Sequence, residues 1–429
     1  MAEVRYLWLI LVLVAGPLWG QAYPSYPLGQ YWIFPDARTL GLAGSGTVSN
    51  TYPGALVMNP AALGMSAVGL QLELSPMVRK LEERRSYPLY NRIDDITQQS
   101  IYALNLHWYG GIQGGLVWRP GWKFLPTMAI GRYREVDQNY RYLEEVRKNI
   151  FGDSLLAENR IAIDGQLQRV SVGGAFRILP AVYVGFQVGI LSGKLDKDSS
   201  ITFFDRRPFA EPGVRITREL LGHPLVFSVG GIFLFNPHFR LGATVQLPYT
   251  VRWKYNRVHR YSETWISGEE RFEYPLQATG GMEFRARQEL QARLNVDVTY
   301  FWWSRTRSKV LSDTHVQNVR GLEDAVHIKA GIEHIFFNKV PFRVGIQFRT
   351  SPKNRRRSRT LLTAGTGFSG KYWHVDMAGG FSPLSYRFPD VFDDSLFGGF
   401  RVEGGLDTVE ENFFFGLLTL RLFPGFLRK

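Results

Sequence analysis

Apolar and polar residues alternate with a period of two along several stretches of the chain. Between residues 291 and 302 one face is wholly apolar, with Ala292, Leu294, Val296, Val298, Tyr300 and Trp302. The same alternation returns at residues 239–247 and 342–349. A period of two places alternate side chains on opposite faces of a β-strand. The runs reach the roughly ten residues that a tilted strand needs to cross a membrane, and most strands of soluble sheets are shorter.

Turn signals divide the chain into fourteen such strands. Short breaks, typical of tight hairpins, occur at Pro120–Gly121, Pro180–Ala181, Asn236–His238, Gln288, Asn338–Lys339 and Ser369–Gly370. Long polar connections alternate with them, at residues 80–98, 135–164, 196–222, 255–270, 304–322, 352–357 and 382–410. This alternation is typical of outer-membrane barrels with periplasmic turns and extracellular loops. The predicted fold class is all-β, a transmembrane antiparallel β-barrel of 14 strands.

The predicted strand starts follow from these breaks. They lie near Ser66, Ile101, Trp122, Gly165, Ala181, Pro224, Phe239, Arg271, Glu289, Glu323, Val340, Ser358, Lys371 and Asn412. Aromatic residues near strand ends are consistent with belts at the two membrane interfaces, although soluble sheets have them as well. They are Trp118, Tyr249, Trp253, Tyr300, Trp302, Trp303 and Trp373.

Composition excludes several other classes of protein. Of 429 residues, 45% are hydrophobic and 14% aromatic, which is too apolar for a disordered chain, and the absence of Cys excludes a disulfide scaffold. After the amino terminus no apolar run reaches the length of a membrane-spanning helix. Residues 1–22 are predicted to be a signal peptide, because Arg5 precedes an apolar stretch from Tyr6 to Trp19 and small residues follow. An uncleaved anchor is the alternative.

The faces opposite the apolar ones carry charged residues, which are expected to point into the lumen. Such charges are tolerated only against water or against each other. Ion-pair ladders that brace the wall are the favoured interpretation, and a substrate-selective charge ring is the alternative. The residues are Arg240, Glu283, Arg285, Arg293, Asp297, Lys329, Glu333, Arg343, Arg349, His374 and Asp376.

Residues 23–65 precede the first strand and are rich in small side chains that allow close backbone packing. In this segment Asn59-Pro60-Ala61 follows a glycine- and alanine-rich stretch, and the sequence resembles the outer-membrane transport proteins of the long-chain fatty-acid transporter (FadL/TodX) type and their PorV-like relatives. The resemblance extends through Leu241-Gly242-Ala243 and Pro275-Leu276 and covers nearly the whole mature chain.

The resemblance implies a barrel over residues 66–429 and a hatch over residues 23–65 that plugs its lumen. It implies an outer-membrane channel for passive uptake of hydrophobic compounds such as long-chain fatty acids, gated by the hatch. The substrate would bind against the hatch and leave sideways through a gap beside a kinked strand. The hatch residues expected to contact substrate are Asn59, Pro60, Ala61, Ala62 and Leu63.

A gap strand is suggested by the segment from Ile101 to Arg119, which is too long for a straight crossing. It contains four glycines that interrupt side-chain packing and favour bulges, Gly110, Gly111, Gly114 and Gly115. Close packing against the hatch is an equally good interpretation of these glycines. The connection around residues 137–159 has a mixed pattern compatible with a short amphipathic helix over the barrel mouth.

A rival function follows from the start Pro35-Asp36-Ala37-Arg38, which looks like PorV-type carriers of type IX secretion cargo. Secretion-system proteins would then be partners. The basic run from Lys353 to Arg359 is predicted to lie in an extracellular connection, where it meets lipopolysaccharide phosphates or is simply solvated. Nucleic acid is not expected as a partner.

Catalysis, metals and cofactors have little support in the sequence. Eight His are scattered, and neither HExxH nor GxSxG occurs. Residues 365–370 match a dinucleotide pattern, but the period of two continues after them, whereas a nucleotide loop must open a helix. The predicted partners are outer-membrane lipid and hydrophobic small molecules. No enzyme activity, metal site or cofactor is predicted.

Overall fold

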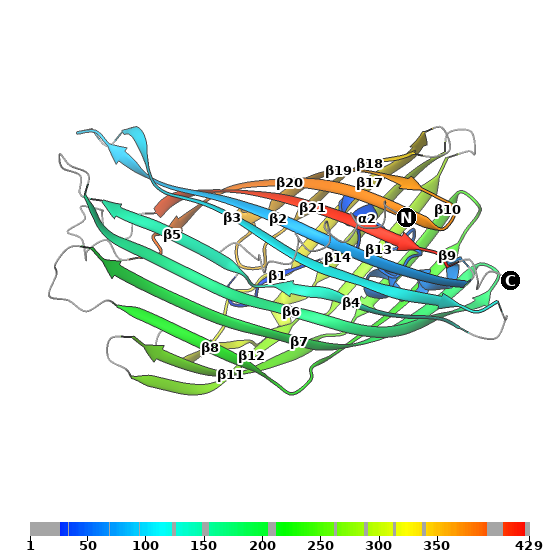
Figure 1. The fold of residues 1–429 in the computed structure, drawn as a ribbon, viewed down its shortest axis with the longest axis horizontal. Coiled ribbons are helices and arrows are strands. Elements are labelled where there is room, and N and C mark those ends of the chain that lie inside the picture. The colour runs from blue at the N-terminus through cyan, green and yellow to red at the C-terminus, as the bar shows by residue number, and fades with distance from the viewer. Residues whose placement is uncertain are drawn as a thin grey trace, which may run out of the picture.

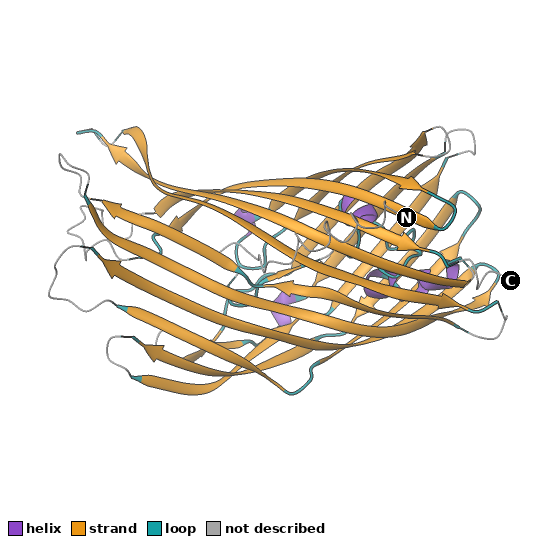
Figure 2. Ribbon diagram, viewed as in Figure 1, coloured by secondary structure: helices purple, strands orange, loops and turns teal. Residues whose placement is uncertain are grey.

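The fold is a closed barrel of long antiparallel strands, seen in a computed structural model of the chain (Figures 1 and 2). It describes residues 26–32, 34–67, 69–93, 95–121, 126–147, 154–204, 212–260, 264–286, 291–311, 315–336, 340–392 and 406–424. The predicted signal peptide and the predicted turns at Gln288 and Asn338–Lys339 lie outside these residues. No helix in the described ranges has the length and apolar character needed to cross a membrane.

Strands account for most of the described chain. They are β1 (Gln30–Tyr31), β2 (Gly69–Tyr90), β3 (Ile96–Arg119), β4 (Thr127–Asp137), β5 (Tyr140–Arg147), β6 (Leu155–Leu179), β7 (Val182–Phe203), β8 (Gly213–Leu221), β9 (Leu225–Leu234), β10 (Phe239–Gln246), β11 (Tyr249–His259), β12 (Trp265–Tyr274), β13 (Gln277–Arg285), β14 (Ala292–Phe301), β15 (Lys309–Leu311), β16 (Val316–Asn318), β17 (Ala325–Phe336), β18 (Val340–Arg349), β19 (Arg359–Ser369), β20 (Trp373–Pro389) and β21 (Leu406–Leu422). The helices are α2 (Ala37–Gly41), α3 (Ala55–Met58) and the 3₁₀ turns η2 (Pro60–Met65), η3 (Trp303–Arg305) and η4 (Arg355–Arg357).

These elements make a 14-stranded wall because several wall strands are interrupted. β4 and β5 both pair with β6, and β8 and β9 both pair with β7, so each pair is one broken strand. β10 with β11, and β12 with β13, are broken in the same way. β21 pairs with β2 and closes the circuit. The predicted fold class is confirmed, and closure leaves no sheet edge to be covered.

The strands are longer than the sequence pattern predicted at one end of the barrel. Much of the predicted connections 80–98, 135–164, 196–222, 255–270 and 382–410 is strand, since β2 runs to Tyr90 and β6 begins at Leu155. The pattern failed there because the outward face is also charged, as in the exposed ion pair between Arg84 and Glu410. The helix expected around residues 137–159 is wrong where the chain is described, because β5 and β6 occupy it.

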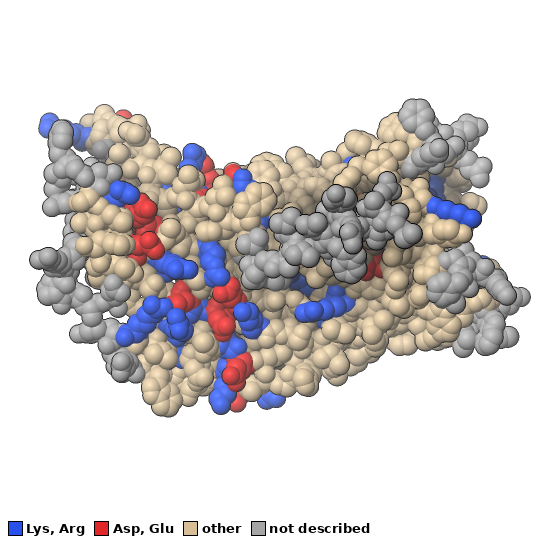
Figure 3. Space-filling model, viewed as in Figure 1, with Lys and Arg blue, Asp and Glu red and all other residues tan. Residues whose placement is uncertain are grey.

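Below these extensions the outer surface is apolar, as the alternation predicted. Ile346 and Val298 are 50% and 44% exposed, whereas the inward Gln347 and Asp297 are buried. One face of the molecule shows most of its charged residues in the half toward the long-connection end, and few in the other half (Figure 3). A surface whose exposed residues are apolar and whose buried residues are charged is that of a barrel in lipid.

The predicted aromatic belt is only partly correct. Trp118 and Trp373 lie on the outer surface, at 38% and 43% exposure. Tyr249, Trp253 and Trp303 are buried instead, and face the lumen. Their position near strand ends could not distinguish the two faces.

The amino-terminal segment, residues 26–66, lies inside the barrel. α2 packs against β18 to β21, while η2 packs against β6, β7 and β9 on other parts of the wall. A segment that contacts so much of the circuit must occupy the lumen, and Figure 2 shows its helices enclosed by strands. Nearly all residues from Phe34 to Asn50 are buried.

Candidate functional site

The backbone hydrogen-bond ladder of the barrel wall has a gap between β3 and the broken strand β4–β5. β3 pairs with β2 along its whole length, but with β4 only from Gly114 to Trp118. Beyond that point no strand among the described residues continues the ladder on this edge of β3. Two isolated hydrogen bonds that involve side chains connect the strands there. The Leu143 amide donates to Asn105 Oδ1 at 2.7 Å, and Arg134 Nη2 donates to the Gly110 carbonyl at 3.2 Å.

The gap arises because β4 turns inward. Its register against β6 shifts between Arg134 and Val136, as at a β-bulge. Residues 133–140 are all buried, so the alternation of exposed and buried positions is lost there. A wall strand keeps one face outside, and eight consecutive buried residues show that this one has left the wall for the lumen.

The amino-terminal segment attaches to the displaced strand. Gln30 and Tyr31 of β1 pair antiparallel with Asp137 and Val136 of β4. The Trp32 amide also donates to the Glu135 carbonyl at 3.0 Å. The inner edge of the kinked strand is therefore held by the segment that fills the lumen.

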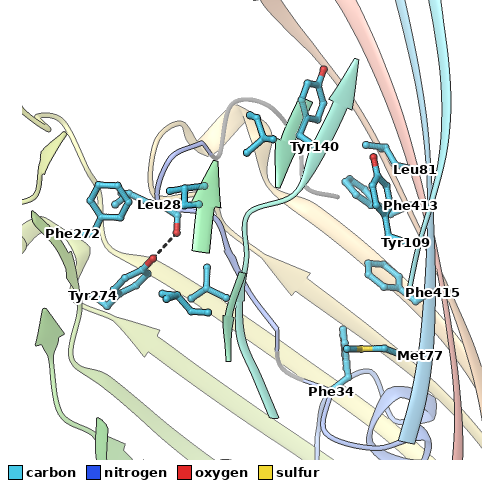
Figure 4. Close-up of a cluster of buried hydrophobic side chains, with 14 of the residues drawn as sticks. Leu28, Phe34, Met77, Leu81, Tyr109, Tyr140, Phe272, Tyr274, Phe413 and Phe415 are labelled. Carbon is cyan, nitrogen blue, oxygen red and sulfur yellow. Dashed lines mark hydrogen bonds between the residues drawn. The ribbon is translucent and has the colours of Figure 1, made fainter. Parts of the chain in front are cut away.

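Aromatic and aliphatic side chains line the lumen above this segment. Figure 4 shows Leu28, Phe272 and Tyr274 facing a second group across the interior, and the Tyr274 hydroxyl donates to the Leu28 carbonyl at 2.9 Å. Tyr249 stacks on Tyr274 with ring centroids 4.9 Å apart. The second group comes from β2, β3 and β21 and contains Leu81, Tyr109, Phe413 and Phe415. Such a lining suits an apolar ligand.

A cavity of about 110 Å³ opens beside this lining at the long-connection end. Its apolar part includes Leu28, Tyr31, Phe301, Trp303 and Leu384. Its polar part is cationic, with Arg349, Lys353, Arg357 and Arg359, and no acidic residue lines it among the described residues.

Most of these cations have no acidic partner in the described chain. Arg359 is paired with Glu411, but no ion pair reaches Arg349, Lys353 or Arg357. Lys353 Nζ donates to the Tyr26 carbonyl at 2.8 Å, and the Arg357 guanidinium lies over the Tyr386 and Phe388 rings. Burial, with Arg357 nearby, lowers the pKa of Lys353 to about 8. The cavity therefore offers positive charge beside an apolar surface.

The lower part of the amino-terminal segment is fixed by buried ion pairs. Arg38 binds Glu333 through two nitrogens, at 2.9 and 3.1 Å, and Arg343 binds the same carboxylate at 2.6 Å. Asp36 contacts Arg421, which also pairs with Glu73 at 2.7 Å. Glu333 and Arg343 are among the inward charges expected from the sequence, and their ion pairs agree with the interpretation of these charges as ion-pair ladders.

A second anchor holds the middle of the segment. Asp297 Oδ2 accepts hydrogen bonds from the Gly46 amide, the Thr47 amide and the Thr47 hydroxyl, all within 2.9 Å. The segment is thus attached to strands on different parts of the wall.

The predicted hatch residues Asn59, Pro60, Ala61, Ala62 and Leu63 are fully buried against the wall. Asn59 caps η2 by accepting from the Ala61 amide at 3.1 Å, and its Nδ2 donates to the Gly231 carbonyl at 3.3 Å. A Cβ on Gly230 would lie 1.9 Å from Asn59 Oδ1, so only glycine permits this approach. These residues do not line the cationic cavity, and their contact with substrate stays a prediction.

The four glycines of the predicted gap strand lie in β3, and none of them is a bulge. The register with β2 is unbroken through Gly110, Gly111, Gly114 and Gly115, and its irregularities fall at Arg85/Ser86 and Leu89/Tyr90. Gly114 and Gly115 are in the paired part of the β3–β4 ladder, while Gly110 and Gly111 lie in the part of β3 that is unpaired on this edge. The kink is in β4, the next strand.

The other predicted motifs fall on ordinary structural elements. The dinucleotide-like residues 365–370 end β19 and turn toward β20, and no helix follows. In the basic run, Arg355 is on the surface beside Glu323, but Lys353 and Arg359 face inward. The run lies in the connection between β18 and β19, as predicted, but the sequence could not show that Lys353 and Arg359 face the cavity, because a turn has no period from which to read direction.

The fold is shared with several solved structures. A Pseudomonas aeruginosa FadL homologue superposes with a TM-score of 0.66 at 14% identity, over 92% of this chain and 99% of that one. The Ralstonia pickettii toluene transporter TbuX gives 0.60 at 16% identity, over 91% and 98%. The P. putida toluene transporter TodX gives 0.60 at 12% identity, over 90% and 98%.

The sequence matches no family model and no curated protein. The structural likeness therefore establishes a shared fold, the 14-stranded barrel of the FadL and TodX channels, which the sequence resemblance had indicated.

Proposed function

We propose that this protein is an outer-membrane channel for passive uptake of hydrophobic compounds. The observation that carries the proposal is the gap between β3 and β4–β5, next to an aromatic lumen. The apolar outer surface supports a membrane location, and the fold shared with hydrophobic-compound channels supports the transport class. The ligand enters from the long-connection end, rests on the aromatic lining and leaves sideways into lipid.

Long-chain fatty acids are the proposed substrates within this class. A neutral hydrocarbon would add no counter-charge to Arg349, Lys353 and Arg357, which have no acidic partner among the described residues, whereas a carboxylate would pair with them and place its tail on the apolar lining. The cationic cavity thus favours an amphipathic anion over a hydrocarbon such as toluene.

The amino-terminal segment is the proposed hatch. Its upper part, from Tyr26 to Trp32, touches both the cavity and the kinked strand. A ligand in the cavity competes with the bond between Lys353 and the Tyr26 carbonyl and so loosens this part of the segment. The lower part stays on its ion-pair anchors during passage.

The lateral exit is tested by a bulky residue at Gly110. A Cβ there meets only the Met77 carbonyl, at 3.4 Å, so Gly110→Trp is compatible with the fold and places an indole at the gap. We expect uptake of radiolabelled oleate to fall to background in Gram-negative cells that lack their own fatty-acid channel.

Gly280→Trp is the matched control, because a Cβ at Gly280 has open space around it on the lipid-facing wall. It should transport like the parent protein. Equal transport by both variants, with both folded by circular dichroism, would show that ligand does not leave beside β3.

The alternative of a type IX secretion carrier has no support in these comparisons. It would be favoured by copurification of a secretion channel with the protein from its own membrane. An acyl chain in the lumen of the same preparation would favour transport.

A further inference from the structure

On the outer surface, side chains change from apolar to cationic at one height on neighbouring wall strands. The apolar Leu247 precedes Arg252 along one strand, and Leu276 lies below Arg271 on the next. All three wall strands here are broken at this height, after β10, after β12 and after β14. An abrupt change from apolar to charged marks the edge of the lipid core.

Three cations form a row across this boundary. Arg252 of β11 is directly opposite Arg271 of β12, which is directly opposite Lys309 of β15. All three side chains are exposed. Like charges directly opposite each other in a sheet are destabilising.

The positive charge of this row is only partly neutralised by acidic side chains of the described protein. Arg271 pairs with Glu273 at 2.5 Å, but no acidic side chain pairs with Arg252 or Lys309 among the described residues. One step farther from the lipid, Lys254 is opposite both Glu219 and Glu269. The same strands therefore alternate charge where they face water and concentrate it at the boundary.

A groove lies against the row on the lipid side. It has a volume of about 700 Å³ and is formed at the breaks in the strands. Its apolar lining includes Pro248, Pro275, Leu276 and Trp302. Its charged lining is Arg271, Arg305 and Glu273, the carboxylate that pairs with Arg271. The site therefore combines several cations with an apolar slot below them.

We propose that this site binds lipopolysaccharide of the outer leaflet. Its phosphates would lie on the row Arg252, Arg271 and Lys309, and an acyl chain would lie in the groove below. Guanidinium and ammonium groups form strong charge-assisted bonds with phosphate, and only a ligand with both parts uses both parts of the site. The proposal rests on the outer-membrane location proposed above, and it differs from the predicted contact at residues 353–359.

The test is lipid binding by the purified full-length protein in a non-ionic detergent. Native mass spectrometry would measure binding of bisphosphorylated lipid A, of the same lipid without phosphates, and of phosphatidylglycerol. We expect Arg252→Gln with Lys309→Gln to weaken lipid A binding on the order of thirtyfold, which corresponds to about 1 kcal/mol for each cation removed near a charged lipid surface. The pair Arg160→Gln with Lys194→Gln removes the same charge from exposed positions elsewhere and should bind normally.

Three results would overturn the proposal: equal affinity of the row variant and its control, equal binding of the dephosphorylated lipid, or preference for phosphatidylglycerol. Oleate uptake by the Arg252→Gln, Lys309→Gln variant separates a failure of the lipid-site proposal from a failure of the channel proposal. Normal uptake with lost lipid A binding supports both proposals, whereas absent uptake by the unmodified protein with intact lipid A binding would reject only the channel.

Discussion

At the scale of single residues, Lys353 is a cavity group whose charge can be changed within an ordinary range of pH. Its half-buried side chain lines the cavity, and its ammonium is bonded only to the Tyr26 carbonyl among the interactions described. Because its pKa is lowered to about 8, below that of a free lysine, it loses its proton as the pH rises through that value. A carboxylate ligand then loses one of its partners.

We predict that decanoate binds about tenfold more weakly at pH 9 than at pH 7, as expected if only the protonated amine binds and its pKa is near 8. Lys353→Arg should remove most of this dependence, because a guanidinium stays charged throughout the range. Decanol, which is neutral, is the ligand control. Isothermal titration of the detergent-solubilised protein measures all three, and a pH dependence that persists in Lys353→Arg would exclude Lys353 as its source.

At the scale of elements, the amino-terminal segment combines a firmly held part with a lightly held part. α2 is tied to the wall through Arg38 and Glu333, whereas β1 has only two residue pairs with β4. Buried ion pairs are costly to break from one side, because the remaining charge is left without a partner. Here Arg343 remains on Glu333, which limits the loss.

We predict that Arg38→Met lowers the free energy of local opening of residues 36–66 by about 3 kcal/mol. Hydrogen exchange read by mass spectrometry should show faster exchange in peptides of this segment and unchanged exchange in β17 and β18. Arg84→Met is the matched control, since its pair with Glu410 is exposed and contributes little. Protection equal to that of the parent would mean that packing, and not the ion pair, holds the segment.

At the scale of the whole molecule, the barrel exposes apolar residues and buries charged ones. The wall can be stable only if lipid covers this surface, and closure then satisfies the backbone groups that lipid cannot. A charged substitution on the outer face should therefore be strongly destabilising here. In a water-soluble sheet, by contrast, an exposed Ile can be replaced by a charged residue at little cost in stability.

We predict that Ile346→Arg, in the middle of β18, destabilises the protein in lipid by about 2–4 kcal/mol. Asn256→Arg, on the outward face of β11 beyond the charged row, should change stability by less than about 0.5 kcal/mol. Urea unfolding in bilayers measures both. A negligible effect of Ile346→Arg, or a protein that stays folded and monomeric in buffer without detergent, would contradict the membrane barrel.

The sequence alone determined the wall of this protein. Alternation in segments such as 291–302 identified both the strands and the face that meets lipid, because each outward residue experiences the same solvent whatever its neighbours are. Alternating short and long connections then determined the strand number. The alternation did not identify the extensions of β2 and β6, because both faces of the strands are polar there and apolar and polar residues no longer alternate.

Only the tertiary structure decided where the wall opens and which charges meet. The kink lies in β4 and not in β3, the neighbouring strand that carries the glycines, because the turn of β4 into the lumen depends on its partners β1 and β6, which are distant in sequence. Likewise, Lys353 belongs to a cavity shared with Tyr31 and Trp303, and Arg252 faces Arg271 through register. Periodicity shows the direction of a side chain from its strand, but only the packing of separate segments determines what that side chain meets.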